Sequence, residues 1–289
     1  NIKGQYVASP LPRGAGITLS LVKADGLLRI PANVQGYEEG TRVEVELYKP
    51  KEVIDRTLLV VGSHDLTLDL LGTVLKQKNP EVRFISSHVG SLGGLLALKA
   101  GTTHLAGLHL FDEVTETYNI PYVEKYLANK RVVLINLAYR MQGWMVQKGN
   151  PEEITGLEDI ASRGLPIINR QKGSGTRILL DHLLKKGGIS PNRIQGYNRE
   201  EYTHLTVAAA VASGSVKAGI GIYSAAKLYS LDFIPICEER YDLLMEESFY
   251  QSDFGTLVLE AMESKEFKER VESLGGYSMR DTSQVLYRT

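Results

Sequence analysis

The sequence predicts an α/β protein in which a small all-β module precedes a larger α/β region of two lobes. Residues 1–50 hold short apolar runs broken by glycine and proline, and no apolar face with helical spacing. From residue 57 onward strands and helices alternate, which is typical of a parallel sheet with right-handed crossovers. Two long β segments, at about 132–147 and 234–245, have the length of strands that cross between two lobes.

The N-terminal module is predicted from alternation. In residues 43–47, apolar Val and Leu alternate with Glu, which is the pattern of a half-buried strand. Lys49, Pro50 and Lys51 then resemble a linker. We therefore expect one domain over residues 1–50 and a second over 57–289.

The second domain is expected to divide into lobes at the two crossing segments. Lobe one would comprise about 57–138 and 240–289, and lobe two about 139–239. The strands expected in order are 57–61, 82–86, 104–110, 132–147, 166–168, 218–223, 233–236 and 241–245. The helices expected between and after them are 66–78, 91–99, 157–163, 177–186, 206–213 and 252–274.

Composition excludes several classes of protein. The 289 residues carry 33 basic and 34 acidic side chains, a formal net charge of -1, so no global field attracts nucleic acid or an anionic membrane. The single cysteine, Cys237, excludes an internal disulfide and a zinc site of paired thiolates. Neither a long apolar run nor the apolar segment of a secretory signal is found, so we expect a cytoplasmic protein with no membrane partner.

Three loops share one design that suits an anion. Residues 62–65, 90–94 and 173–177 each follow a strand, contain glycine with Ser or Thr, and open a helix. Free backbone N–H groups and the helix dipole favour an anion there, and in α/β sheets such loops gather at the carboxyl ends of the strands. The alternative is that the hydroxyls only cap their helices.

The candidate ligand-binding residues are those that can donate a hydrogen bond to an oxyanion or line the cleft. His64 and His204 can donate or cap a helix, Arg140 and Arg177 can bind an oxyanion or lie in solvent, and Tyr223 can line the cleft or the core. The full set is Ser63, His64, Ser91, Arg140, Ser174, Gly175, Thr176, Arg177, His204 and Tyr223.

Catalytic and metal templates are absent from the sequence. No Gly-x-Ser-x-Gly elbow, phosphate loop, dinucleotide fingerprint or His-Glu-x-x-His pair occurs, and His104 and His109 are expected to point to opposite faces of one strand. An enzyme acting through Ser63 and His64 or another pair stays an alternative, although adjacency of the two gives no ordered base. We expect no metal site and no catalytic residue in this chain.

The first fifty residues resemble the C-terminal β-barrel domain of MoeA-type molybdopterin molybdenumtransferases. The resemblance rests on Ser20, the run 24–27 of Ala-Asp-Gly-Leu, Pro31, and Gly40 before the strand at 43–45. It implies a small β-barrel. The chain begins at Asn1 within a structured pattern, so we expect the MoeA catalytic domains upstream, and no residue here inherits their roles.

Residues 57–289 are similar to the periplasmic-binding-protein-like domain that some prokaryotic MoeA homologues carry behind that barrel. The matching stretches are 62–65, 88–95, 173–177, 218–221 and 239–243. The resemblance implies a two-lobed type II periplasmic-binding-protein fold, related to the molybdate- and tungstate-binding proteins and more distantly to the effector domains of LysR-type regulators.

The resemblance implies a non-catalytic module that binds molybdate or tungstate between its lobes for molybdenum cofactor biosynthesis, without a covalent cofactor. Ser63 and Ser91 would donate from lobe one, and Ser174, Thr176 and Arg177 from lobe two. The alternative is a sensor or regulatory domain that binds a small organic anion or a pterin. Whether the barrel pairs two chains into a homodimer stays open.

Overall fold

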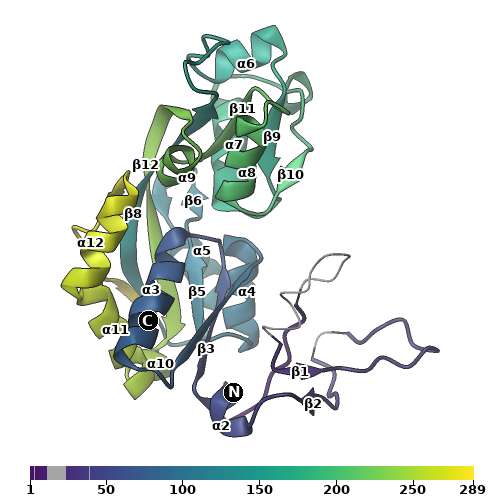
Figure 1. Cartoon of the computed structure of the whole chain (residues 1–289), viewed down its shortest axis with the longest axis vertical. Helices are drawn as coiled ribbons and strands as arrows, with labels where there is room; N and C mark the ends of the chain where they lie inside the picture. Colours follow the sequence, from purple (N-terminus) through teal and green to yellow (C-terminus); the bar gives the residue numbers. More distant parts are fainter. Residues whose placement is uncertain (3, 12–23, 39) are drawn as a thin grey trace.

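A mixed 10-stranded sheet runs through the computed structural model, which describes residues 1–2, 4–11, 24–38 and 40–289. Its strands are β3 (Thr57–Gly62), β4 (Arg83–His88), β5 (Leu105–Leu108), β8 (Val132–Val146), β9 (Ile167–Arg170), β10 (Glu200–Glu201), β11 (Ala218–Ile222), β12 (Asp232–Glu246), β13 (Tyr277–Ser278) and β14 (Val285–Arg288). The order is β10-β9-β11-β8-β12-β5-β3-β4, and β13 and β14 pair with β8. Figure 1 shows the molecule as two lobes, one above the other.

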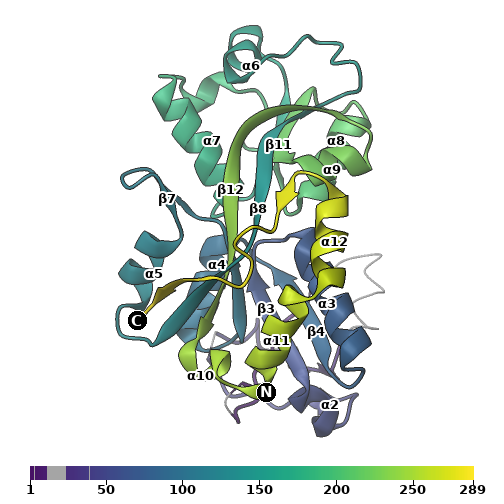
Figure 2. The same ribbon diagram turned by 90° about the vertical axis from the view of Figure 1, so that its left-hand side faces the viewer.

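Two long strands connect the lobes. β8 and β12 have 15 residues each and pair antiparallel, from Asp232 opposite Val146 to Glu246 opposite Val132. At one end β12 pairs with β5, next to β3 and β4, and at the other end β8 pairs with β11, next to β9 and β10. Figure 2 shows the two strands running side by side between the lobes. The predicted two-lobed α/β architecture is confirmed.

Helices cover both faces of each half of the sheet, because its strands are apolar on both sides. In the first lobe α3 (Leu66–Lys78), α11 (Asp253–Glu263) and α12 (Lys265–Leu274) bury one face. The opposite face lies under α4 (Ser91–Ala100) and α5 (Ile120–Leu127). In the second lobe α6 (Leu157–Arg163) and α7 (Gly175–Lys186) cover one face, and α8 (His204–Ala212) and α9 (Tyr223–Leu228) the other.

Side chains in the polar loops fix where the helices begin. Asp65 accepts from the Thr67 N–H at the start of α3, and Ser174 accepts from the Arg177 N–H at the start of α7. Thr203 caps α8 in a capping box with Thr206. The caps hold the loop residues at the edge of the sheet where the two lobes meet.

The expected N-terminal barrel is not evident in the described part of residues 1–50. The sheet found there is a single antiparallel pair, β1 (Gly26–Leu27) with β2 (Glu46–Leu47). Ile2 is the one buried apolar side chain described in this segment, so the described part of the segment shows no core of the kind that closes a barrel. Ser20, part of the barrel motif, lies outside the described residues.

Smaller differences occur at helices. The short helix α2 (Lys51–Asp55) begins at the last residue of the predicted linker, and the predicted helix 252–274 is two helices. Ser264 interrupts it with an extended backbone and caps α12 by accepting from the Phe267 N–H at 3.3 Å. Among the described helices, none has the length and apolar character needed to span a bilayer.

Candidate functional site

An ion pair between the crossing strands lies at the centre of the candidate site. Arg140 on β8 and Glu239 on β12 are direct register partners, and Arg140 Nε donates to Glu239 Oε1 at 2.5 Å. Arg140 Nη1 donates to Asp65, the residue that caps α3. All three side chains are at most 1% exposed. The guanidinium therefore ties both crossing strands to a helix of the first lobe.

A second line of hydrogen bonds joins Glu239 to Ser63 through His109. Glu239 Oε2 lies 3.0 Å from His109 Nδ1, and His109 Nε2 lies 2.7 Å from Ser63 Oγ. Burial raises the pKa of Glu239, but Arg140 and His109 outweigh this and lower it to about 2. Burial lowers the pKa of His109, so the ring is neutral at neutral pH. His109 Nδ1–H thus donates to the carboxylate, and Nε2 accepts from the Ser63 hydroxyl.

The three glycine-rich loops meet at His109. Ser63, from the first loop, bonds to the ring, and Ser91, from the second, accepts from the His109 N–H at 3.1 Å. Gly175, from the third, packs against His109 from the other lobe. A Cβ at Gly175 would lie 2.0 Å from the His109 carbonyl oxygen and 2.3 Å from Nδ1. The loops of both lobes therefore converge on one residue.

Three of the predicted hydroxyls are buried acceptors that keep a proton to donate. Each uses its oxygen to accept a hydrogen bond from the protein: Ser91 from the His109 N–H at 3.1 Å, Ser174 from the Arg177 N–H at 3.2 Å, and Thr176 from Gln142 Nε2 at 2.9 Å. All three residues are fully buried. A hydroxyl that accepts in this way still has its own O–H available to a ligand.

Arg170, the last residue of β9, is fully buried and has no carboxylate partner. Its guanidinium donates to Gln171 Oε1 and to the backbone carbonyls of Glu201 and Tyr202, at 3.0 to 3.2 Å. No carboxylate of the described residues lies within ion-pair distance of it, and Nη1 has no hydrogen-bond partner there. Burial, with Arg140 nearby, lowers the pKa of Arg170 to about 9, so the group is cationic at neutral pH.

Other buried polar atoms in the same region are also unpartnered among the described residues. They are Arg140 Nη2, Gln171 Nε2, Gln142 Oε1, His64 Nδ1 and both ring nitrogens of His204. Burial lowers the pKa of His204 well below its ordinary value, and the positive charges of Arg170 and Arg140 lower it further. These side chains therefore lie within one another's electrostatic field. Buried polar groups in native proteins have partners, so this concentration indicates a ligand site.

Two predicted ligand residues do not join this cluster. The Arg177 guanidinium is neutralised within lobe two, because it donates to Asp181 at 3.2 Å and to Glu200 at 3.3 Å. Arg177 therefore has two carboxylate partners within its own lobe, which distinguishes it from the other predicted donors. Tyr223 is 38% exposed, and its ring packs edge-on against Phe233 at 5.3 Å.

His64 is placed beside the cluster and not in its hydrogen-bond network. The residue is 7% exposed, its Nε2 lies 3.8 Å from Asp69, and its ring packs at 4.5 Å against His88. The Ser63 hydroxyl is bonded to His109 and not to its neighbour His64, so the histidine paired with Ser63 is the one 46 residues away.

Sequence reasoning missed five polar residues that complete the cluster. Asp65 lies inside a predicted loop, Gln142 follows Arg140 by two and shares its face of β8, and Arg170 ends the strand three residues before the third loop. These positions were a usable signal, since buried strand ends hold ligands in α/β sheets. The missed residues are Asp65, His109, Gln142, Arg170 and Glu239.

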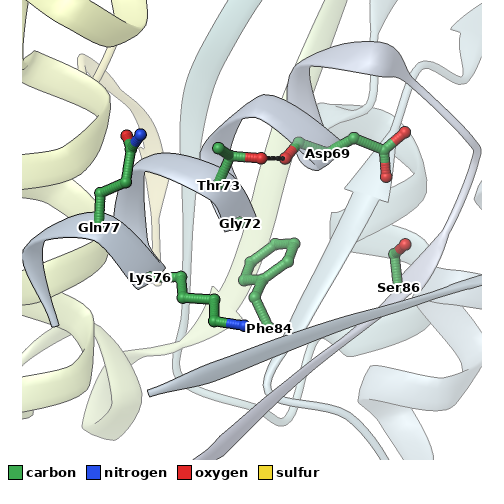
Figure 3. A pocket seen from close by; sticks show the side chains of 7 residues that line it. All are labelled: Asp69, Gly72, Thr73, Lys76, Gln77, Phe84 and Ser86. Carbon is green, nitrogen blue, oxygen red and sulfur yellow. Dashed lines mark hydrogen bonds between the residues drawn. The ribbon is translucent and has the colours of Figure 1, made fainter. Parts of the chain in front are cut away.

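A surface hollow of about 580 Å³ lies between α3 and β4, and one of its lining residues, Asp69, is 3.8 Å from His64. Figure 3 shows the side chains that line it, with Phe84 of β4 below the Gly72 turn of α3. None of its lining residues has a buried unpartnered polar atom. Among the described residues, no group of three or more His, Cys, Asp or Glu side chains is arranged to hold a metal ion.

A two-lobed α/β fold with polar loops converging between its lobes defines a periplasmic-binding-protein-like domain. Residues 72–263 match the family model of the PBP superfamily domain, so the chain belongs to the PBP superfamily. Residues 1–48 match the model of the MoeA C-terminal region (domain IV). The chain is also 35% identical over 245 residues to the uncharacterized protein YvgK of Bacillus subtilis, covering 83% of this chain and 79% of YvgK.

Solved structures agree with the fold. The tungstate ABC transporter protein of Geobacter sulfurreducens has a TM-score of 0.56 at 16% identity, covering 76% of this chain and 99% of that one. A putative phosphate ABC transporter substrate-binding protein of Clostridium perfringens, with bound phosphate, has a TM-score of 0.55 at 14% identity, with 75% and 97% covered. At these identities the likeness shows the fold alone.

Proposed function

We propose that the chain binds a small oxyanion between its two lobes. The observation that carries this proposal is Arg170, a fully buried guanidinium without a carboxylate partner among the described residues. A buried charge without a counter-charge costs several kcal/mol. An anion at Arg170 Nη1 supplies that counter-charge, and the lobes can then close around it.

The surrounding donors suit the oxygens of such an anion. Arg140 Nη2 and Gln171 Nε2 are buried and unpartnered in the described chain. Ser91, Ser174 and Thr176 keep their hydroxyl protons, as described above. Hydrogen bonds from a guanidinium to an anion are among the strongest in proteins, and they replace the water that the anion gives up.

The ligand candidates fall into two classes. Molybdate or tungstate, in molybdenum cofactor biosynthesis, is supported by the similarity of residues 1–48 to a MoeA C-terminal region and by the fold shared with a tungstate transporter protein. A small organic anion or a pterin, bound by a sensor domain, is favoured by Gln142 Oε1, a buried acceptor without a donor in the described chain. In either role we propose a cytoplasmic, non-catalytic chain that works with MoeA-type domains.

Calorimetric titration of the full chain with molybdate, tungstate, sulfate, phosphate and pterin-6-carboxylate tests the proposal. We expect one anion to bind per chain with at least one of these ligands, and Arg170→Met to weaken that binding at least a hundredfold. Arg177→Met is the matched control, since Arg177 is already paired with Asp181 and Glu200. Absence of heat with every anion at millimolar concentration would contradict the proposal.

A further inference from the structure

The geometry points to a ligand that carries a hydrogen-bond donor of its own as well as anionic oxygens, and it assigns Ser63 as the acceptor of that donor. This inference rests on the proposed anion site and narrows its ligand. Hydrogen phosphate and hydroxyl- or N–H-bearing organic anions fit the requirement. Sulfate, molybdate and tungstate, which carry no hydrogen at neutral pH, do not.

The Glu239 carboxylate fixes the orientation of the His109 ring. The Glu239 carboxylate receives hydrogen bonds from Arg140 Nε at 2.5 Å and Gln142 Nε2 at 2.8 Å, which is the environment of an ionised group. An ionised carboxylate can only accept, so the His109 Nδ1 that lies 3.0 Å away must carry the ring proton. His109 Nε2 is then left with a lone pair.

The Ser63 hydroxyl is oriented by that lone pair. Ser63 Oγ lies 2.7 Å from His109 Nε2, so its single proton points to the ring. The oxygen then has only lone pairs for any further partner, so Ser63 would accept from a ligand, where its residue type predicts that it donates. The backbone carbonyl of Ser63 is held in place by Tyr241, which donates to it at 2.7 Å.

Gln142 supplies a second acceptor by an independent route. Its Nε2 donates to Glu239 Oε1 at 2.8 Å and to Thr176 Oγ1 at 2.9 Å. Only the amide nitrogen can face an ionised carboxylate, so Oε1 must face the other way. That oxygen is buried and has no donor among the described residues. A neutral His204 offers one more acceptor, since one of its two unpartnered ring nitrogens carries no proton.

A site that contains such acceptors should bind an anion without a hydrogen-bond donor more weakly. An oxygen of sulfate or molybdate beside Ser63 Oγ would leave both atoms without a proton between them. The hydroxyl of hydrogen phosphate, or an N–H of a pterin, can donate to Ser63 Oγ. Arg140 and Arg170 meanwhile bind the anionic oxygens of either kind of ligand.

The test compares anions of matched shape on the full chain at pH 8. Phosphate and sulfate are tetrahedral dianions at this pH, and they differ in the one hydroxyl of phosphate. Molybdate is the third probe, and pterin-6-carboxylate tests the organic source. Dissociation constants are measured for wild type, Ser63→Ala and Ser91→Ala, with the melting of each variant followed by fluorescence of the single tryptophan, Trp144.

We expect wild type to bind phosphate or the pterin at least tenfold more tightly than sulfate and molybdate. Ser63→Ala should weaken the donor-bearing ligand about tenfold, the size of one hydrogen bond, and leave sulfate within about threefold. Ser91→Ala removes a hydroxyl that keeps its proton, so it should weaken every anion by a similar factor. If the pterin alone binds tightly, the donor-bearing ligand is an organic anion and not hydrogen phosphate.

Sulfate or molybdate binding as tightly as phosphate and the pterin would overturn the inference and leave the proposed anion site standing. An equal loss for all anions in Ser63→Ala would do the same, because it would make Ser63 a donor. If no probe binds, the anion site itself falls. The ratio of the wild-type dissociation constants for donor-bearing and donor-free anions decides the question even if Ser63→Ala does not fold.

Discussion

Arg140 and Glu239 lie directly opposite each other on the two strands that connect the lobes, with Arg140 Nε 2.5 Å from Glu239 Oε1. Each of the two residues is only 1% exposed to solvent. Through Asp65 on one side and His109 on the other, it fixes the orientation of both first-lobe groups at the lobe junction. A ligand between the lobes would therefore meet a prearranged set of donors and acceptors.

Glu239→Gln should reduce the fall in the free energy of unfolding that wild type shows as pH drops below 4.5. The folded-state pKa of Glu239, about 2, is below its ordinary value of 4.5, so its contribution is present above pH 4.5 and is lost as pH falls toward 2. The difference corresponds to about 3 kcal/mol in the free energy of unfolding. Urea unfolding of wild type and variant at pH 4.5, 3.5 and 2.5 measures it.

The unfolding measurements start at pH 4.5 because the titration of Asp242 also changes the stability at higher pH. Burial raises the pKa of Asp242 from 3.8 to about 6, so its protonation adds stability as pH falls through 6 and has the opposite sign. Asp242 is common to both proteins, and the difference between them isolates Glu239. Parallel curves for wild type and Glu239→Gln below pH 4.5 would contradict the prediction.

Gly175→Ala should hold the lobes apart without unfolding them. The new Cβ would lie 2.0 Å from the His109 carbonyl oxygen, a contact between lobes that opening relieves. We expect a larger radius of gyration by small-angle scattering, at least hundredfold weaker anion binding, and a melting temperature within a few degrees of wild type. Gly187→Ala, at the end of the same helix, is the control, since its Cβ meets nothing closer than 3.4 Å. Anion binding by Gly175→Ala as tight as that of wild type would contradict the inference that the two lobes close around the anion.

Arg170→Met should bind no anion and yet be at least as stable as the unliganded wild type. The substitution removes a buried cation that lacks a carboxylate partner among the described residues, and such a cation costs several kcal/mol. Thermal melting without added anion measures this. A fall of more than about 2 kcal/mol in the free energy of unfolding would show that Arg170 is structural.

Removal of residues 1–50 should leave the two-lobed domain folded. The four apolar clusters of the described chain are formed by residues beyond 57. The segment is held by polar contacts, including Arg83 Nη1 to Asp25 at 2.9 Å and His104 Nε2 to the Asn1 carbonyl at 2.9 Å. We expect melting within about 5 °C of the full chain, as a loss of a few surface contacts implies. Aggregation or loss of anion binding in the truncated chain would contradict this.

The sequence was most informative where periodicity is strong. The crossing segments expected at about 132–147 and 234–245 are β8 and β12, and all three glycine-rich loops open helices as predicted. The predicted barrel is not evident because the described part of residues 1–50 buries little apolar surface, which alternation within one short strand does not reveal.

The chemistry of the site was harder to predict, because hydrogen-bond direction depends on partners far away in the sequence. By residue type Ser63 is a donor, but its proton is fixed by His109, 46 residues along the chain, and His109 is oriented by Glu239, a further 130 residues away. Arg177 and Arg170 are equally plausible anion ligands by residue type. Only the placement of Asp181 and Glu200 shows that Arg177 is neutralised and Arg170 is not.

A crystal of the full chain grown with arsenate tests the central claim most directly. Arsenate is tetrahedral, carries a hydroxyl at pH 8, and can be located by its anomalous scattering. We expect one anomalous peak per chain between the lobes, within hydrogen-bond distance of Arg140 Nη2 and Arg170 Nη1, with one arsenate oxygen beside Ser63 Oγ. An anomalous peak elsewhere, or none at saturating arsenate, would contradict the account.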